Sequence, residues 1–109
     1  IGASNVAVGN SSLQNNNGGN NVAVGRNAAK AGIDANQNVA VGSGALSNNL
    51  QSNMTAVGYL ALNSNENGID NTATGAYALQ NTTGSNNTAI GNNTLKTSTV
   101  SFGPWPSNR

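Results

Sequence analysis

The sequence predicts an all-β protein, a parallel β-roll or β-solenoid of about six coils that is probably best described by its repeat. Three observations lead to this prediction: a five-residue motif recurs at a nearly fixed spacing, each copy contains a short β-branched segment, and glycine and asparagine separate these segments. A fixed period indicates one structural unit that is repeated, and stacking such units buries a continuous core.

Each repeat contains a motif that ends in glycine. The motif reads NVAVG three times and then MTAVG, NTATG and NTAIG, and its glycines are 16, 17, 16, 17 and 16 residues apart. Glycine adopts a positive φ without steric cost, so these positions predict tight turns. The predicted structural turn residues are Gly9, Gly25, Gly42, Gly58, Gly75 and Gly91.

The three residues before each motif glycine are typical of a short strand. Their outer positions are always β-branched and their centre is always alanine, and no helical period is present. Because successive side chains of a strand point to opposite faces, the alanines share one face and the flanking residues share the other. Which face lies inside stays open, although the constant alanine favours the tighter side. The predicted core or trimer-interface columns are Ala7, Ala23, Ala40, Ala56, Ala73 and Ala89, and Val8, Val24, Val41, Val57 and Ile90.

A second turn is predicted seven residues before each motif glycine. Glycine occupies this position in four units, and alanine or glutamine occupies it in the other two. Two turns per unit leave room for two short strands, which predicts a two-sided roll whose strands pair with their copies in the next coil. The residues at this second turn are Gly2, Gly18, Ala35, Gln51, Gly68 and Gly84.

Asparagine is the most frequent residue, with 23 positions. Five of the six motifs are preceded or begun by asparagine in one column, which predicts a ladder of stacked amides, and Met54 is the exception. Two other structures stay open: a disordered polar tract, and an antiparallel meander with hairpins at Asn17-Gly18 and Asn67-Gly68. Neither requires a constant phase through six units or an alanine fixed before each glycine, so the solenoid is favoured.

The repeat is predicted to form one domain over residues 1–96. Residues 97–109 leave the pattern and contain the single Phe, the single Trp and both prolines. Because the open ends of a solenoid need capping, this segment is interpreted either as a cap over the last coil or as a linker.

Composition narrows the chemistry. Four Lys plus Arg and three Asp plus Glu give a net charge of +1, and the apolar runs are short, so neither a nucleic-acid partner nor direct membrane insertion is predicted. The chain has no His and no Cys, and Asp34 and Asp70 are out of register with each other. We therefore predict no enzyme activity and no catalytic, metal-binding or cofactor-binding residue.

Two groups of side chains remain as candidates for surface contacts. Tyr59 and Tyr77 follow motif glycines in adjacent coils and are interpreted as packing residues at a chain interface or as carbohydrate-stacking rings, with packing favoured. Thr55, Thr72 and Thr88 share one column, which is compatible with ice binding but is also explained by β-propensity.

The repeats resemble those of a known group of proteins. The segment NTTGSN (residues 81–86) followed by NTAIG (residues 87–91) resembles repeats of bacteriophage tail fibres that precede a self-cleaving chaperone domain. The NVAVG motif is also similar to the NSVAIG motif of YadA-like heads in trimeric autotransporter adhesins, which are parallel β-rolls with a shorter repeat. The resemblance covers residues 2–96, and the longer unit of this chain favours the tail-fibre group.

The resemblance implies a non-enzymatic structural or adhesive segment of a homotrimeric fibre, with a tail fibre that takes part in host attachment as the first choice. It further implies an extracellular location, on a virion or on a bacterial cell surface. The partner would be a surface receptor such as a glycan or an outer-membrane protein. The alternatives are the head of a bacterial adhesin or another cell-surface fibre, and an ice-binding β-solenoid.

Overall fold

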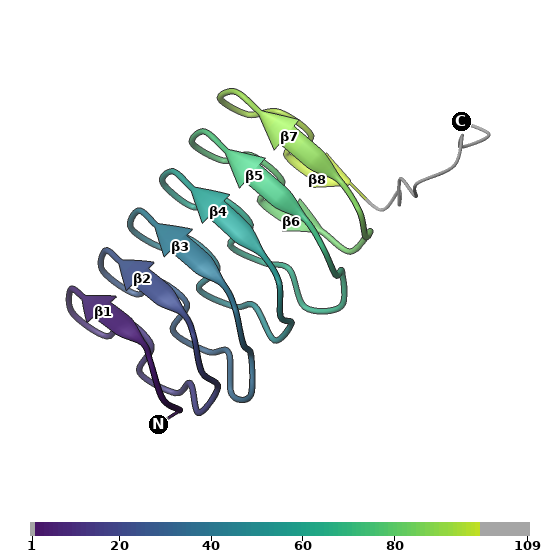
Figure 1. The fold of residues 1–109 in the computed structure, drawn as a ribbon. Coiled ribbons are helices and arrows are strands. Elements are labelled where there is room, and N and C mark those ends of the chain that lie inside the picture. Colours follow the sequence, from purple (N-terminus) through teal and green to yellow (C-terminus); the bar gives the residue numbers. More distant parts are fainter. Residues whose placement is uncertain (1, 99–109) are drawn as a thin grey trace.

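The computed structural model describes residues 2–98, which form an all-β parallel solenoid (Figure 1). Six strands form the main sheet in the order β1-β2-β3-β4-β5-β7, β6 and β8 form a second sheet, and all pairs are parallel. The predicted parallel β-solenoid is therefore confirmed, and the chain makes about 5 turns. The strands are β1 (Val6–Val8), β2 (Val22–Val24), β3 (Val39–Val41), β4 (Thr55–Val57), β5 (Thr72–Thr74), β6 (Asn81–Thr82), β7 (Thr88–Ile90) and β8 (Thr97–Ser98).

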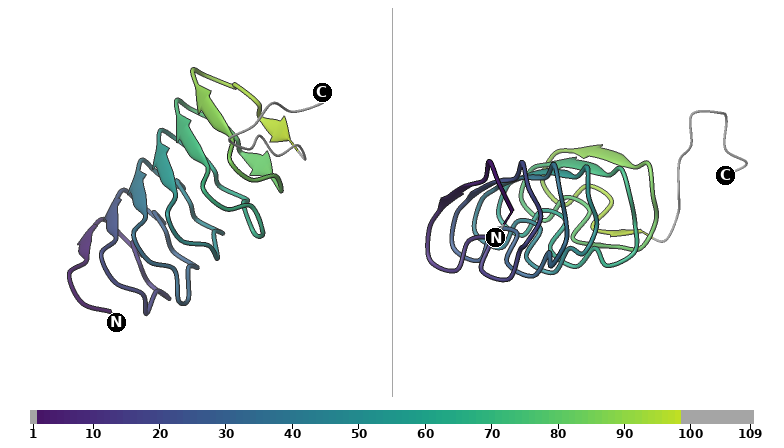
Figure 2. Two further views of the ribbon diagram at one scale, coloured as in Figure 1. Left: turned by 45° about the vertical axis from the view of Figure 1, so that its right-hand side comes forward. Right: turned by 60° about the horizontal axis from the view of Figure 1, so that its bottom comes forward.

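Successive strands of the main sheet pair without any shift. Each central alanine lies opposite the alanine of the next strand, as in Ala23 and Ala40. The amide of each motif glycine extends this ladder, and Gly42 N–H donates to the carbonyl of Val24 at 2.7 Å. Figure 2 shows the resulting stack of coils, in which each coil repeats the path of the one before it.

The return side of the coil differs from the prediction of two strands per unit. Only the last two coils have strands there, β6 and β8, and the earlier coils return through turns. The cause is a left-handed residue four positions after each motif glycine, with φ between 44° and 52°. These residues are Leu13, Ala29, Leu46, Leu62, Leu79 and Leu95.

Hydrogen bonds between coils continue on the return side despite this kink. Leu46 N–H donates to the carbonyl of Ala61 at 3.0 Å, and Asn48 N–H donates to the carbonyl of Asn63 at 2.9 Å. The backbone of the return side is thus satisfied by the next coil in the same way as that of the sheet. β8 continues this pairing two residues past position 96, and residues 99–109 of the predicted cap or linker lie outside the described residues.

The second turn also differs in detail from the prediction. The positive φ is not at the glycine seven residues before the motif glycine but two residues later, with φ between 57° and 63°. Glycine at the earlier position is explained by space, because a Cβ on Gly18 would overlap the carbonyl oxygen of Ala35 in the next coil. The left-handed residues of this turn are Ser4, Asn20, Gln37, Asn53, Asp70 and Asn86.

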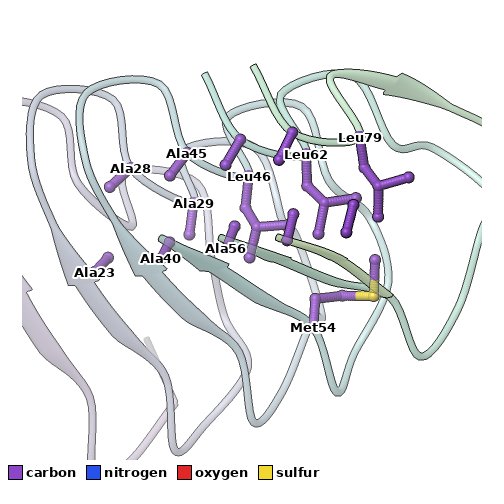
Figure 3. Close-up of a cluster of buried hydrophobic side chains, with 14 of the residues drawn as sticks. Ala23, Ala28, Ala29, Ala40, Ala45, Leu46, Met54, Ala56, Leu62 and Leu79 are labelled. Carbon is purple, nitrogen blue, oxygen red and sulfur yellow. The ribbon is translucent and has the colours of Figure 1, made fainter. Parts of the chain in front are cut away.

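The core is a thin layer between the main sheet and the return side (Figure 3). Alanines of the sheet face leucines of the return side, and Leu46, Leu62 and Leu79 are fully buried. A left-handed conformation costs a leucine about 1–2 kcal/mol, whereas burying its side chain stabilises the fold by about 1.5–3 kcal/mol. Burial therefore outweighs the backbone strain, which explains how leucine can occupy this turn.

The close stacking at the motif glycines predicts a large effect of a side chain there. Gly58 has a φ of 138°, and a Cβ on it would lie 2.6 Å from the carbonyl carbon and oxygen of Gly75. We expect Gly58→Val to lower the free energy of unfolding by roughly 2–4 kcal/mol, measured by chemical denaturation. Asn48→Ser, at an exposed position, is the control and should change it little. Equal unfolding of the two variants would show that the assigned turn is wrong.

Candidate interaction surface

The structure separates the two columns that the sequence could not assign to a face. The alanine column points inward, and Ala23, Ala40, Ala56 and Ala73 are fully buried, whereas Ala7 in the first coil is exposed. The valine and isoleucine column points outward. Its exposed side chains are Val8 (57%), Val41 (36%), Val57 (36%) and Ile90 (71%), and Val24 is half-buried.

The outward side chains of the main sheet form a flat surface, which we call the outer face. It consists of the first and third residues of the six main-sheet strands, and none of them is charged. The first four strands present only valine apart from Thr55, while β5 and β7 present Thr72, Thr74 and Thr88 beside Ile90. Contiguous apolar side chains on a surface are typical of a contact with another protein.

An asparagine ladder fixes the start of each strand in the main sheet. The backbone N–H of Asn21 donates to Oδ1 of Asn5 at 2.8 Å, and that of Asn38 donates to Oδ1 of Asn21 at 2.8 Å. The Nδ2 of Asn21 donates to the carbonyl of Ala35 at 2.8 Å. Each amide thus binds two backbone groups of the next coil. The bonds run from side chain to backbone, not from amide to amide as in the predicted ladder.

Met54 interrupts this ladder, and a second column compensates. Asn71 N–H reaches the Sδ of Met54 at 3.4 Å, and a thioether is a weak acceptor. The carbonyl of Gly68 accepts instead from Nδ2 of the buried Asn65 at 2.8 Å. Asn65 also donates to Oδ1 of Asn49 at 2.9 Å, which ties it to the preceding coil. The outer face therefore rests on a continuous polar scaffold across the Met54 coil.

Two tyrosines and a lysine form a cluster beside the outer face. Tyr59 and Tyr77 have ring centroids 5.5 Å apart at an angle of 87°, so one ring meets the other edge to face. The Nζ of Lys96 lies 4.8 Å from the ring centroid of Tyr77. Nearly half of the Tyr59 side chain is exposed. The sequence placed these tyrosines near each other but gave no indication of the lysine, because it lies 19 residues beyond Tyr77.

The acidic residues form no centre of chemistry in the described part of the chain. Asp34, Glu66 and Asp70 are all exposed, and residues 2–98 contain no group of three metal-ligating side chains. The same range contains no helix that is both long and apolar enough to cross a bilayer. The arrangement offers surfaces for contact, and its chemistry is that of apolar and polar packing.

No family model, curated protein or solved structure matches this chain. Its function is therefore argued from the outer face, the polar scaffold under it and the charges at its sides.

The asparagine ladder predicts a high cost for the loss of one amide. Asn38 is buried, accepts from the N–H of Met54 at 2.8 Å and donates to the carbonyl of Gln51 at 3.0 Å. Asn38→Ala leaves both backbone groups without these partners, and we expect it to lower the free energy of unfolding by roughly 2–4 kcal/mol. Asn48→Ala, at an exposed asparagine, should cost far less. Indistinguishable denaturation midpoints would contradict a structural role for the ladder.

Proposed function

We propose that this chain is a non-enzymatic structural and adhesive segment of a homotrimeric extracellular fibre, with a bacteriophage tail fibre as the first choice. The observation that carries the proposal is the outer face, an uncharged and largely apolar surface on one side of a repeating rod. The repeat supplies length, and the outer face supplies contacts between copies.

A parallel sheet is normally covered on both faces. Here the return side covers the inner face, whereas the outer face has no cover within residues 2–98. Copies of the same chain around a common axis would cover it, because each coil presents the same apolar column at the same place. The resemblance of the repeats to those of trimeric fibres supports three copies.

The magnitude of the contact suits a long fibre. Complete burial of an exposed valine is worth about 1.5–3 kcal/mol, and side chains such as Val8 and Val41 begin about half exposed. Several such residues in each chain supply an energy of the same order as the cost of association, about 4–15 kcal/mol. Each added coil enlarges the interface without a further cost of association, so a longer stack binds more tightly.

The resemblance also supports the location and the role of the fibre. Repeats such as NTAIG in tail fibres support attachment to a host, with a glycan or an outer-membrane protein as the receptor, and a location on a virion. The likeness of NVAVG to the adhesin-head motif supports one alternative, a fibre on a bacterial cell surface.

A charge on the outer face should prevent assembly. Val41 is near the centre of the outer face and is 36% exposed, so Val41→Asp would place a carboxylate in the contact between copies. We expect the wild-type chain of 10.8 kDa to have about three times this mass in light scattering, and the variant to be monomeric or unfolded.

The matched control is Asn48→Asp, which adds the same charge to an exposed residue of the return side. It should leave the trimer intact. A wild-type chain that is folded, stable and monomeric at micromolar concentration would refute the proposed assembly.

A further inference from the structure

The charged side chains within residues 2–98 are divided between two edges of the rod. The edge that follows the strands, from each motif glycine to the fifth residue after it, carries Arg26, Lys30 and Lys96, and we call it the basic edge. The edge that leads into the strands, from nine to five residues before each motif glycine, carries Asp34, Glu66 and Asp70, and we call it the acidic edge. Figure 1 shows these two sets of turns on opposite sides of the main sheet.

Opposite charges also occur at similar heights along the stack. Arg26 and Lys30 follow β2, and Asp34 lies in the turn between β2 and β3. Further along, Glu66 and Asp70 lie in the turn between β4 and β5. The basic edge at that height carries the tyrosine cluster, whose hydroxyl groups can donate to carboxylates.

The two edges cannot meet within one chain, because the width of the sheet separates them. They can meet between copies. If the rods lie parallel with their outer faces toward a common axis, the basic edge of each copy adjoins the acidic edge of the next. If two rods pack face to face in antiparallel fashion, like edges adjoin instead, and like charges oppose each other.

We propose that copies of this chain assemble in parallel and in register, with the basic edge of each copy against the acidic edge of its neighbour. This inference rests on the proposed function, because the outer face must first bring the copies together. Exposed ion pairs contribute little affinity, so the apolar outer face supplies most of it. The charges select the direction and the relative height of the copies.

A charge exchange between the edges tests this proposal. Arg26 and Asp34 are both exposed, so Arg26→Asp and Asp34→Arg should leave the fold intact, as checked by circular dichroism. Each single variant places like charges at the contact, and we expect it to raise the concentration for half-assembly about tenfold at low salt. The double variant R26D/D34R has the composition and net charge of the wild type and should restore assembly.

Sedimentation equilibrium at low and at high ionic strength measures these effects. In about 1 M salt the Debye length falls to roughly 3 Å, and the differences among the four proteins should disappear. Assembly of the wild type that neither single variant weakens, or a double variant no better than the single ones, would overturn the pairing of the edges alone. A folded monomeric wild type would overturn it together with the proposed function.

Discussion

The constraint on which the structure depends is the register between coils. A strand of three residues has few hydrogen bonds of its own, so each backbone group must find its partner in the next coil at the same position of the repeat. The asparagine ladder reinforces this register, because each amide binds an N–H and a carbonyl of the following coil. Units of 16 and 17 residues can both be accommodated, since the additional residue falls in the exposed turn that contains Asp34 or Glu66.

Register also explains the composition. Coils that stack directly on one another leave no room for a Cβ at the motif glycines or at Gly18, and only alanine fits beneath the sheet. Such a core lacks the volume of a globular interior, and polar scaffolding supplies the rest. Fully buried Asn21 and Asn65 have partners for their amides in adjacent backbone or side chains. A chain poor in large apolar residues can therefore be ordered, because its side chains repeat in identical surroundings.

Much of the fold could be predicted from the sequence, because spacing and alternation report register and face directly. The motif glycines, the paired alanines and the parallel sheet follow from the period alone. The return side could not be predicted, because leucine normally avoids a positive φ, and only the burial of a residue such as Leu46 makes it favourable. The role of Gly18 was also hidden, since a requirement for space and a requirement for φ select the same residue.

The surface was predictable to a lesser degree. Alternation along Val39–Val41 showed that two apolar faces exist, but their assignment needed the position of the return side. The division of charge into two edges depends on where each turn lies around the coil, and the distance between Lys96 and Tyr77 depends on the stacking of adjacent coils.

The most direct test of this account is a distance between two coils within one chain. Asn15 and Asn81 each lie six residues after a motif glycine, four coils apart, and both are exposed on the return side. The chain has no Cys, so Asn15→Cys and Asn81→Cys allow specific nitroxide labelling, with unlabelled chain added in excess. Four parallel steps of about 4.8 Å predict a separation of roughly 19 Å by pulsed electron paramagnetic resonance. A separation of roughly 38 Å, as expected for an antiparallel meander with two strands per unit, would contradict the stacked solenoid.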